Sequence, residues 1–280
     1  MRLNIATCRP LPEPDVDEDL LLGALLAAGV DARMAAWQDA AAWDQPTPTV
    51  IRSTWDYIHD LPSFAEWLVK VAKVAPLWNP VRLIFDNLHK RYLLDLAGRS
   101  VPVTPTTLLE RGSEVNLATI CAARGWRDIV IKPAVGAGSF ETHRYRGASP
   151  EAADTLRRLL ATRDVLVQPF LRAVEDHGER ALVWIDGDFT HAVRKSPRFS
   201  GHDEQVSEAL PISAAERRVG EAALAPIARD LLYARVDVVP GDDGSPLVME
   251  LELVEPSLFL KQHPPALERL VRGIVRRLEA

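Results

Sequence analysis

Cysteine is scarce in this chain of 280 residues, and its two cysteines, Cys8 and Cys121, lie far apart in the sequence. No CxxC pair, HExxH motif or other zinc-ligand spacing is present, so the sequence does not indicate a zinc centre. A Ser-His-Asp or Cys-His set cannot be assembled from it either, which argues against nucleophilic catalysis by a side chain. The cysteine usage fits a reducing compartment.

Long apolar runs and a basic excess are also missing. No run approaches the ~18 residues that span a bilayer, and the N-terminal MRLNIATCRP lacks the pattern of a signal peptide. The formal net charge of −6 argues against a nucleic acid or an anionic membrane as partner. We therefore expect a cytoplasmic protein with no nucleic-acid or membrane partner.

What the sequence does contain is typical of a globular α/β protein with two or three small domains. Strands and helices alternate as far as Pro80, and hairpins predominate after residue 128. The expected units are residues 1–86, 87–170 and 171–280. Expected strands are residues 3–7, 31–37, 49–53, 128–132, 140–145, 165–170, 180–185 and 189–194. Expected helices include 20–28, 62–75, 88–97 with Asn87 as N-cap, 113–124 with Ser113 as cap, 150–162, 213–231 and 265–279.

Two runs near the C-terminus, residues 234–239 and 247–254, predict a hairpin because PGDDGSP separates them. If Val239 pairs with Val248, then Asp237 lies opposite Glu250 and Arg235 lies opposite Glu252, all on one face. Such carboxylates repel one another unless one is protonated or a cation lies among them. An oxygen-only cluster of Asp237, Glu250 and Glu252 suits Mg²⁺. The alternative is an amphipathic hairpin whose polar face is in water.

The segment IVIKPAVGAGS (129–139) places Lys132 at the end of a strand and a glycine loop directly after it. This order differs from a Walker A loop, but a strand lysine and loop amides together can hold phosphates. An ordinary hairpin with a surface lysine is the alternative. Lys90, expected inside a helix, is a weaker signal.

Two further segments carry candidate binding groups. In VLVQPFL (165–171) a strand bends at Pro169, and the backbone around Gln168, Phe170 and Leu171 could recognise an adenine edge. In the hairpin that follows, Arg180, Arg194 and Lys195 could bind carboxylate or phosphate groups. The alternatives are a strand that ends at a proline and solvated surface charges.

Taken in this order along nearly the whole chain, these features resemble the ATP-grasp superfamily. The resemblance implies two α+β lobes that hold ATP, preceded by a small Rossmann-like domain. Lys90 and Lys132 would hold the phosphates under the loop of Gly136, Gly138 and Ser139. Residues 168–171 would read adenine, Glu179 the ribose, and Arg180, Arg194 and Lys195 would face the transferred phosphate or the acid substrate. Glutathione-synthetase-like members end the metal site with Glu-x-Asn, whereas this chain has Glu250-x-Glu252.

A narrower resemblance rests on IRSTWDY (51–57), HAVRKSP (191–197) and LELVEPSLFL (251–260). These stretches are similar to the cyclo-ligases that close O-ureido-D-serine in cycloserine formation, a step of antibiotic biosynthesis. The resemblance implies substrate contacts from Arg52, Ser53, Trp55, Asp56, Glu255 and Ser257. Alternatively, Trp55 and Tyr57 would plug a domain interface.

The implied activity is an ATP- and Mg²⁺-dependent carbon–nitrogen ligase that forms ADP and phosphate. It would convert a small amino-acid-like carboxylate to an acyl phosphate for attack by a nitrogen, within the same molecule or from a second one. A peptide or amino-acid ligase and a non-catalytic ATP-binding regulator are the alternatives. A homo-oligomer is compatible with the sequence, which reveals no interface.

Overall fold

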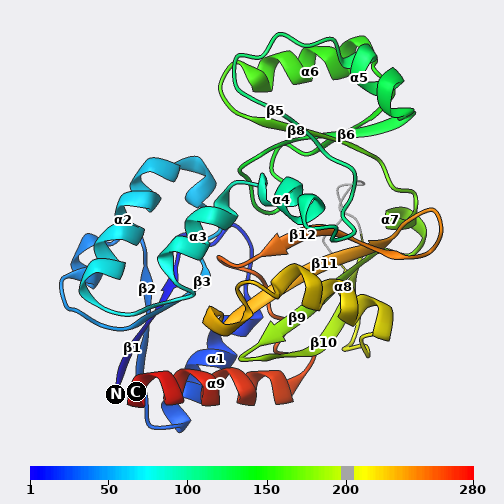
Figure 1. The fold of residues 1–280 in the computed structure, drawn as a ribbon. Helices are drawn as coiled ribbons and strands as arrows, with labels where there is room; N and C mark the ends of the chain where they lie inside the picture. Colours follow the sequence, from blue (N-terminus) through cyan, green and yellow to red (C-terminus); the bar gives the residue numbers. More distant parts are fainter. Residues whose placement is uncertain (197–204) are drawn as a thin grey trace.

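Three four-stranded sheets follow one another along the part of the chain that the computed structural model describes, residues 1–196 and 205–280 (Figure 1). Each sheet is built from consecutive strands, because the connections are short enough for neighbours in sequence to pair. No helix in the described residues is long and apolar enough to cross a membrane.

The first sheet is parallel, as the alternating pattern predicts, with strand order β2-β1-β3-β4. Its strands are β1 (Arg2–Thr7), β2 (Asp31–Ala36), β3 (Thr49–Ser53) and β4 (Leu77–Trp78). Its helices are α1 (Val16–Ala27), α2 (Leu61–Val74) and α3 (Val81–Leu88), with 3-10 turns η1 (Ala40–Trp43) and η2 (Tyr57–His59). Helix α2 buries Phe64, Trp67, Leu68 and Val71, the apolar stripe expected from the sequence.

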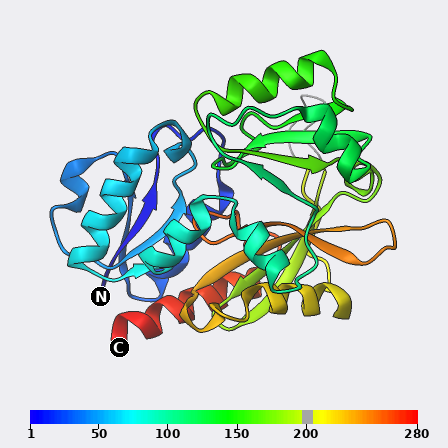
Figure 2. The same ribbon diagram turned by 45° about the horizontal axis from the view of Figure 1, so that its top comes forward.

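The second sheet is antiparallel, with strand order β5-β8-β6-β7. Its strands are β5 (Thr107–Leu109), β6 (Asp128–Pro133), β7 (His143–Arg146) and β8 (Val165–Pro169), and the helices of this region are α4 (Tyr92–Gly98), α5 (Leu117–Arg124) and α6 (Pro150–Leu160). Helices α5 and α6 cover the outer face (Figures 1 and 2). They bury a separate small core with that face, which leaves the inner face toward the third sheet.

The third sheet is antiparallel, with strand order β10-β9-β11-β12. Its strands are β9 (Glu179–Ile185), β10 (Asp188–Lys195), β11 (Tyr233–Pro240) and β12 (Pro246–Glu252), joined with α7 (Ala173–Asp176), α8 (Ala214–Leu224), η3 (Ala228–Asp230) and α9 (Pro264–Glu279). Asp186 and Gly187 at the β9–β10 turn both have positive φ, so the expected two-residue turn is confirmed.

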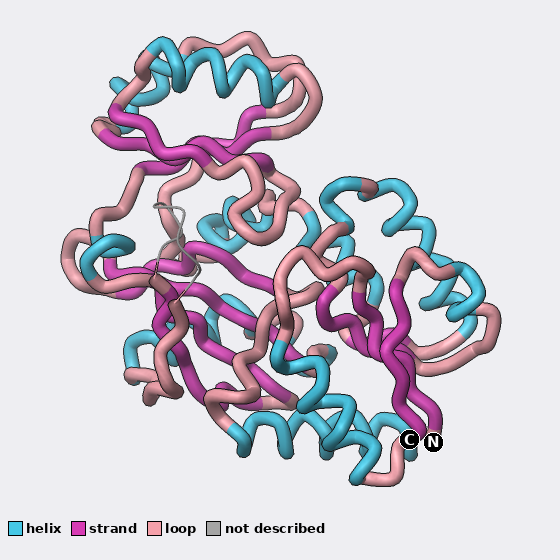
Figure 3. Tube along the Cα trace, turned by 180° about the vertical axis from the view of Figure 1, so that it is seen from behind, coloured by secondary structure: helices cyan, strands magenta, loops and turns pink. Residues whose placement is uncertain are grey.

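The first and third sheets share one hydrophobic core. Helix α9 lies beside α1, and Leu3, Leu21, Val183 and Leu270 belong to the same buried cluster. The two chain ends consequently lie next to each other (Figures 1 and 3). The first unit is therefore packed onto the last one, and the domain boundaries at residues 86/87 and 170/171 stay predictions.

The register of the C-terminal hairpin confirms the expected partners of the acidic residues. Asp237 pairs with Glu250 and Arg235 pairs with Glu252. Nearer the turn the expected pairing is wrong, because a bulge between Asp237 and Val238 makes Val248 the partner of Val238.

Three helix predictions need correction. Asn87 is the penultimate residue of α3, where it is buried, and does not cap a helix over 88–97; Lys90 lies between α3 and α4. Helix α5 begins after Asn116, whose side chain caps it in place of Ser113. The helix expected over 213–231 ends at Leu224, because its C-terminal part forms η3. Capping residues are numerous in loops, and tertiary packing selects among them.

Candidate active site

A cleft of about 1220 Å³ lies between the second and third sheets. Its walls come from β6, β7 and the residues after β8 on one side, and from β11 and β12 on the other. The loop that contains Trp55 and Tyr57, from the first unit, closes one end. The topology therefore brings residues from all three regions of the sequence to one cavity.

Two buried lysines lie in this cleft. Lys90 Nζ is 2.7 Å from Glu250 Oε1 and donates to the Gly136 carbonyl at 2.7 Å. Although burial opposes its charge, Glu250 raises the pKa of Lys90. Lys132 is 9% exposed and makes no hydrogen bond or ion pair within the described residues. Burial, with the nearby Lys90 charge, lowers the pKa of Lys132. Two ammonium groups side by side form a site for an anion.

The glycine loop lies above these lysines. Gly136, Gly138 and Ser139 all line the cleft, and Gly138 has a φ of 56°, in the left-handed region that glycine adopts without strain. Beyond them, Phe140 meets the ring of His59 edge-on, with centroids 5.5 Å apart. The loop therefore reaches from the second sheet to the first unit across the cleft.

The bend after β8 also faces the cleft. The Phe170 amide, expected to be available for a ligand, donates instead to the Asp128 carbonyl at 2.8 Å, because the strand pairing continues through Phe170. Gln168 is buried and donates through Nε2 to Thr106 Oγ1 at 2.8 Å. In the described part of the chain the Leu171 amide has no acceptor, so it is the backbone donor of this bend that remains available to a ligand. Arg144 lies over the Phe170 ring, 3.5 Å from its centroid.

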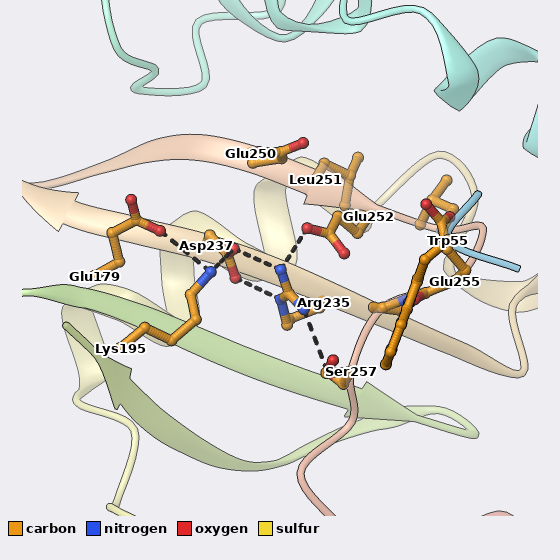
Figure 4. Close-up of polar contacts among 12 residues, drawn as sticks. Trp55, Glu179, Lys195, Arg235, Asp237, Glu250, Leu251, Glu252, Glu255 and Ser257 are labelled. Atoms are coloured by element: carbon orange, nitrogen blue, oxygen red, sulfur yellow. Dashed lines mark hydrogen bonds and ion pairs between the residues drawn. The ribbon is translucent and has the colours of Figure 1, made fainter. Parts of the chain in front are cut away.

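The acidic hairpin carries its own counter-ions (Figure 4). Asp237 accepts from Arg235 Nε at 2.8 Å and Arg235 Nη2 at 2.9 Å, and its Oδ2 is 2.6 Å from Lys195 Nζ. Burial opposes ionisation, but these cations prevail and lower the pKa of Asp237 to about 2. Arg235 also contacts Glu252 and donates to the Ser257 carbonyl. Arg235 and Lys195 thus neutralise part of the negative charge for which the sequence analysis expected a metal ion.

Glu250 and Glu252 fit a magnesium ion, whereas Asp237 does not. Each glutamate gives one oxygen to a basic side chain and keeps the other without a partner in the described residues. Both oxygens of Asp237 are bonded to Arg235 and Lys195. Within residues 1–196 and 205–280 no three His, Cys, Asp or Glu side chains are arranged to hold a metal, so the expected three-carboxylate cluster is not formed.

Burial and the neighbouring carboxylates, acting against Arg235, raise the pKa of Glu252 to about 8. Burial likewise disfavours the charge on Glu250, but Lys90 and Lys132 prevail and hold its pKa below the usual range. The pKa values of the two glutamates are therefore shifted in opposite directions although both residues lie on one strand.

Comparison with known proteins decides the family. The cycloserine biosynthesis protein DcsG of Streptomyces lavendulae is 34% identical over 283 residues, which cover 95% of each protein. The chain belongs to the DcsG family. Residues 3–79 match the family described as D-cycloserine synthetase DcsG, N-terminal domain. The crystal structure of D-cycloserine synthetase DcsG superposes with a TM-score of 0.92 and 33% identity, covering 99% of this chain and all (100%) of that one.

More distant relatives show the fold of this DcsG-family chain. The ATP-grasp ligase PsnB, complexed with its minimal precursor, has a TM-score of 0.68 at 17% identity, over 97% of this chain and 98% of PsnB. A glutathione synthetase of Pseudomonas syringae pv. tomato is 27% identical over 146 residues, 49% of this chain and 44% of that protein. The predicted ATP-grasp fold is confirmed, and the DcsG-family chain is an ATP-dependent ligase.

Two of the expected catalytic residues of the DcsG-family chain lie outside the cleft. Arg180 donates to Glu216 on α8 and to the Pro211 carbonyl, and its partner across the hairpin, Arg194, is exposed. Side chains alternate along a strand, so Glu179 and Lys195 face the cleft while Arg180 and Arg194 face away. The expectation that these arginines face the transferred group is wrong. Pro197, which ends the HAVRKSP stretch, lies outside the described residues.

The six expected substrate residues divide into two groups. Trp55, Glu255 and Ser257 line the cleft. The other three lie behind it: the guanidinium of Arg52 bonds to the Pro256 carbonyl, Ser53 contacts Glu18, and Asp56 accepts from Trp37. Direct substrate contact by Arg52, Ser53 and Asp56 is therefore not supported by this arrangement.

The polar cleft residues that sequence reasoning did not assign to the site include Tyr92, His143, Arg144 and Arg235. Arg235 could have been identified from the sequence, because residues two positions apart on a strand share a face and Arg235 therefore lies on the same face of β11 as Asp237. The position of Arg144 beside Phe170 depends on how β7 pairs with β6, which the sequence does not reveal.

Proposed function

We propose that this ligase uses ATP and Mg²⁺ to convert the carboxylate of a small amino-acid-like substrate to an acyl phosphate, which a nitrogen of the same molecule then attacks. The observation that best supports this proposal is the buried Lys132. A buried ammonium group that makes no direct ion pair in the described residues is unfavourable even with carboxylates nearby, and a phosphate group bound in the cleft would offset that cost. DcsG, the relative of this ligase, is a D-cycloserine synthetase, and cycloserine is a ring. A cyclic product supports an acceptor nitrogen within the substrate molecule itself, as in O-ureido-D-serine.

In the first step a carboxylate oxygen of the substrate attacks the γ-phosphorus, and the bond to the bridging oxygen of ADP breaks. Lys90 and Lys132 hold phosphate oxygens, and the Leu171 amide and Glu179 hold the adenine and ribose. Glu250 and Glu252 would hold Mg²⁺, which supplies positive charge against the phosphates. The loop over residues 136–139 covers the acyl phosphate and excludes water.

In the second step the substrate nitrogen forms a bond to the carbonyl carbon, and phosphate leaves with the electrons of the carbon–oxygen bond. The nitrogen loses its proton to the departing phosphate or to solvent. Positioning and electrostatics supply the rate, so no side-chain nucleophile is required.

The test is ADP and phosphate release with Mg-ATP against small amino acids, dipeptides and O-ureido-D-serine, with product mass read in parallel. We expect substrate-dependent ADP release and a product lighter by water, or by carbamic acid where water then hydrolyses the carbamoyl group from the ring nitrogen. Lys132→Met and Glu250→Gln should each lower turnover by at least about 100-fold, since each removes charge from the phosphate site. The matched variants Lys73→Met and Glu66→Gln, both on the exposed side of α2, should retain it.

Two results would contradict the proposal. Full turnover in both Lys132→Met and Glu250→Gln would refute the residue assignment. ADP release that requires a second amine-bearing molecule, with a product that joins the two, would refute the ring closure.

A further inference from the structure

The segment from residue 253 to residue 261 lies across the third sheet, and side chains of the first unit hold its backbone. Asn79 donates to the Leu253 carbonyl at 2.7 Å, Trp55 to the Glu255 carbonyl at 3.0 Å, and Arg52 to the Pro256 carbonyl at 2.8 Å. Asp17 accepts from the amides of Leu260 and Lys261. A loop with so many backbone partners has a fixed conformation.

This segment presents one carboxylate to the cleft. Glu255 is 7% exposed and lines the cavity together with Trp55 and Tyr57. No basic side chain in residues 1–196 or 205–280 forms an ion pair with it. In Figure 4, Glu255 and Trp55 lie at the opposite end of the group from Lys195 and Glu179.

A buried carboxylate without an ion-paired cation is unfavourable. Burial raises the pKa of Glu255 to about 7, although the charge of Lys90 and a hydrogen bond with Tyr57 act in the opposite direction. A bound cation would remove this cost. Phosphate and carboxylate groups are disfavoured here by charge, whereas an ammonium group gains a charge-assisted hydrogen bond and an aromatic wall. The site therefore fits a primary ammonium group on a small molecule.

We propose that Glu255 binds the protonated α-amino group of the substrate and so selects an amino acid over the matching acid without the amine. The inference rests on the proposed function for the rest of the ligand. The side chains of Arg52, Trp55 and Asp17 bond to the backbone of this segment and hold Glu255 in place, so Arg52 acts on the site indirectly although it does not line the cleft.

The test is equilibrium binding by calorimetry in the presence of Mg²⁺ and a non-hydrolysable ATP analogue. The two probes are O-ureido-D-serine and 3-(ureidooxy)propionate, which differ only in the α-amino group. We expect wild-type protein to bind the amine-bearing probe at least about 10-fold more tightly. Glu255→Gln should weaken binding of that probe by roughly 10- to 100-fold and leave the other within about 3-fold, so that the preference disappears.

Glu66→Gln, the same change on an exposed surface, should keep the preference. Unchanged affinity for the ATP analogue shows that Glu255→Gln is folded. If Glu255→Gln does not fold, Glu255→Asp replaces it in the test. This variant keeps the charge on a shorter side chain and should retain part of the preference for the amine-bearing probe. A wild-type protein that binds both probes equally or neither probe would overturn the inference, as would a full preference in Glu255→Gln.

Parallel ADP release separates this inference from the proposed function. Preference for the amine-bearing probe without ADP release on any substrate would refute the proposed ligase reaction and support Glu255 as an ammonium site. ADP release with equal binding of the two probes would refute the role of Glu255 and leave the reaction intact.

Discussion

Asn87 links helix α3 to strand β12 and the residue that follows it. Its Nδ2 donates to the Leu251 carbonyl at 2.8 Å, and its Oδ1 accepts from the Leu253 amide at 2.8 Å. Asn87→Ala leaves both backbone groups buried without these partners. Each such group costs about 1–3 kcal/mol, and water from the cleft replaces part of the loss, so we expect the free energy of unfolding to fall by about 2–4 kcal/mol.

For a chain of this length that change corresponds to about 3–7 °C in the thermal midpoint. Asn116→Ala is the matched control, because Asn116 makes one exposed cap bond to Thr119, worth about 1 kcal/mol. Turnover should also fall in Asn87→Ala, since Leu251 and Leu253 flank Glu252, and should persist in Asn116→Ala. Calorimetry and ADP release check both. Equal midpoints and equal turnover in the two variants would refute the reasoning.

Other perturbations test the packing. Burial beside His263 lowers the pKa of His191 to about 4, below the usual 6.5, so the unfolded chain binds a proton first. The contribution of His191 to the free energy of unfolding is therefore fully present above pH 6.5 and is lost as the pH falls toward 4. Thermal midpoints measured from pH 8 to pH 4 should decline less in His191→Gln than in the wild type. Parallel curves of midpoint against pH would contradict this. Gly220→Ala places a Cβ 2.5 Å from the Phe189 ring and should cost about 1–3 kcal/mol. Gly23→Ala, with open space around it in α1, should instead stabilise by about 0.5–1 kcal/mol, and the opposite order in urea unfolding would contradict both.

Local patterns were sufficient for much of the fold. The turn residues and the alternation of side chains predicted that Asp237 faces Glu250 and that Arg235 faces Glu252, since both depend only on neighbours in the hairpin. That Arg180 and Arg194 share one face could not be predicted in this way, because a bulge between Phe189 and His191 in β10 shifts the register and makes Arg194 the partner of Arg180. Which face meets the cleft depends on the packing of α8, where Glu216 binds Arg180, and that contact spans 36 residues.

The candidate site was predictable as a set of charges but not as a set of pairs. Lys90, Lys132 and the two glutamates of β12 were identified from the sequence, and all four line the cleft, whereas Asp237 on β11 does not. The sequence could not show that Asp237 is neutralised by Arg235 and Lys195, because ion pairing depends on distances between strands that pair in three dimensions.

The sequence by itself determined the α/β class, the acidic hairpin and the lysine before the glycine loop, because these follow from local periodicity and turn chemistry; the ATP-grasp fold rested on the resemblance of the ordered motifs to that superfamily. The tertiary structure alone decided which side chains enter the cleft. Backbone bonds from Arg52 and Trp55 to the segment around Glu255 join residues about 200 positions apart. Such contacts form only when the first unit packs onto the last sheet, and they place a buried carboxylate where a substrate amine can reach it.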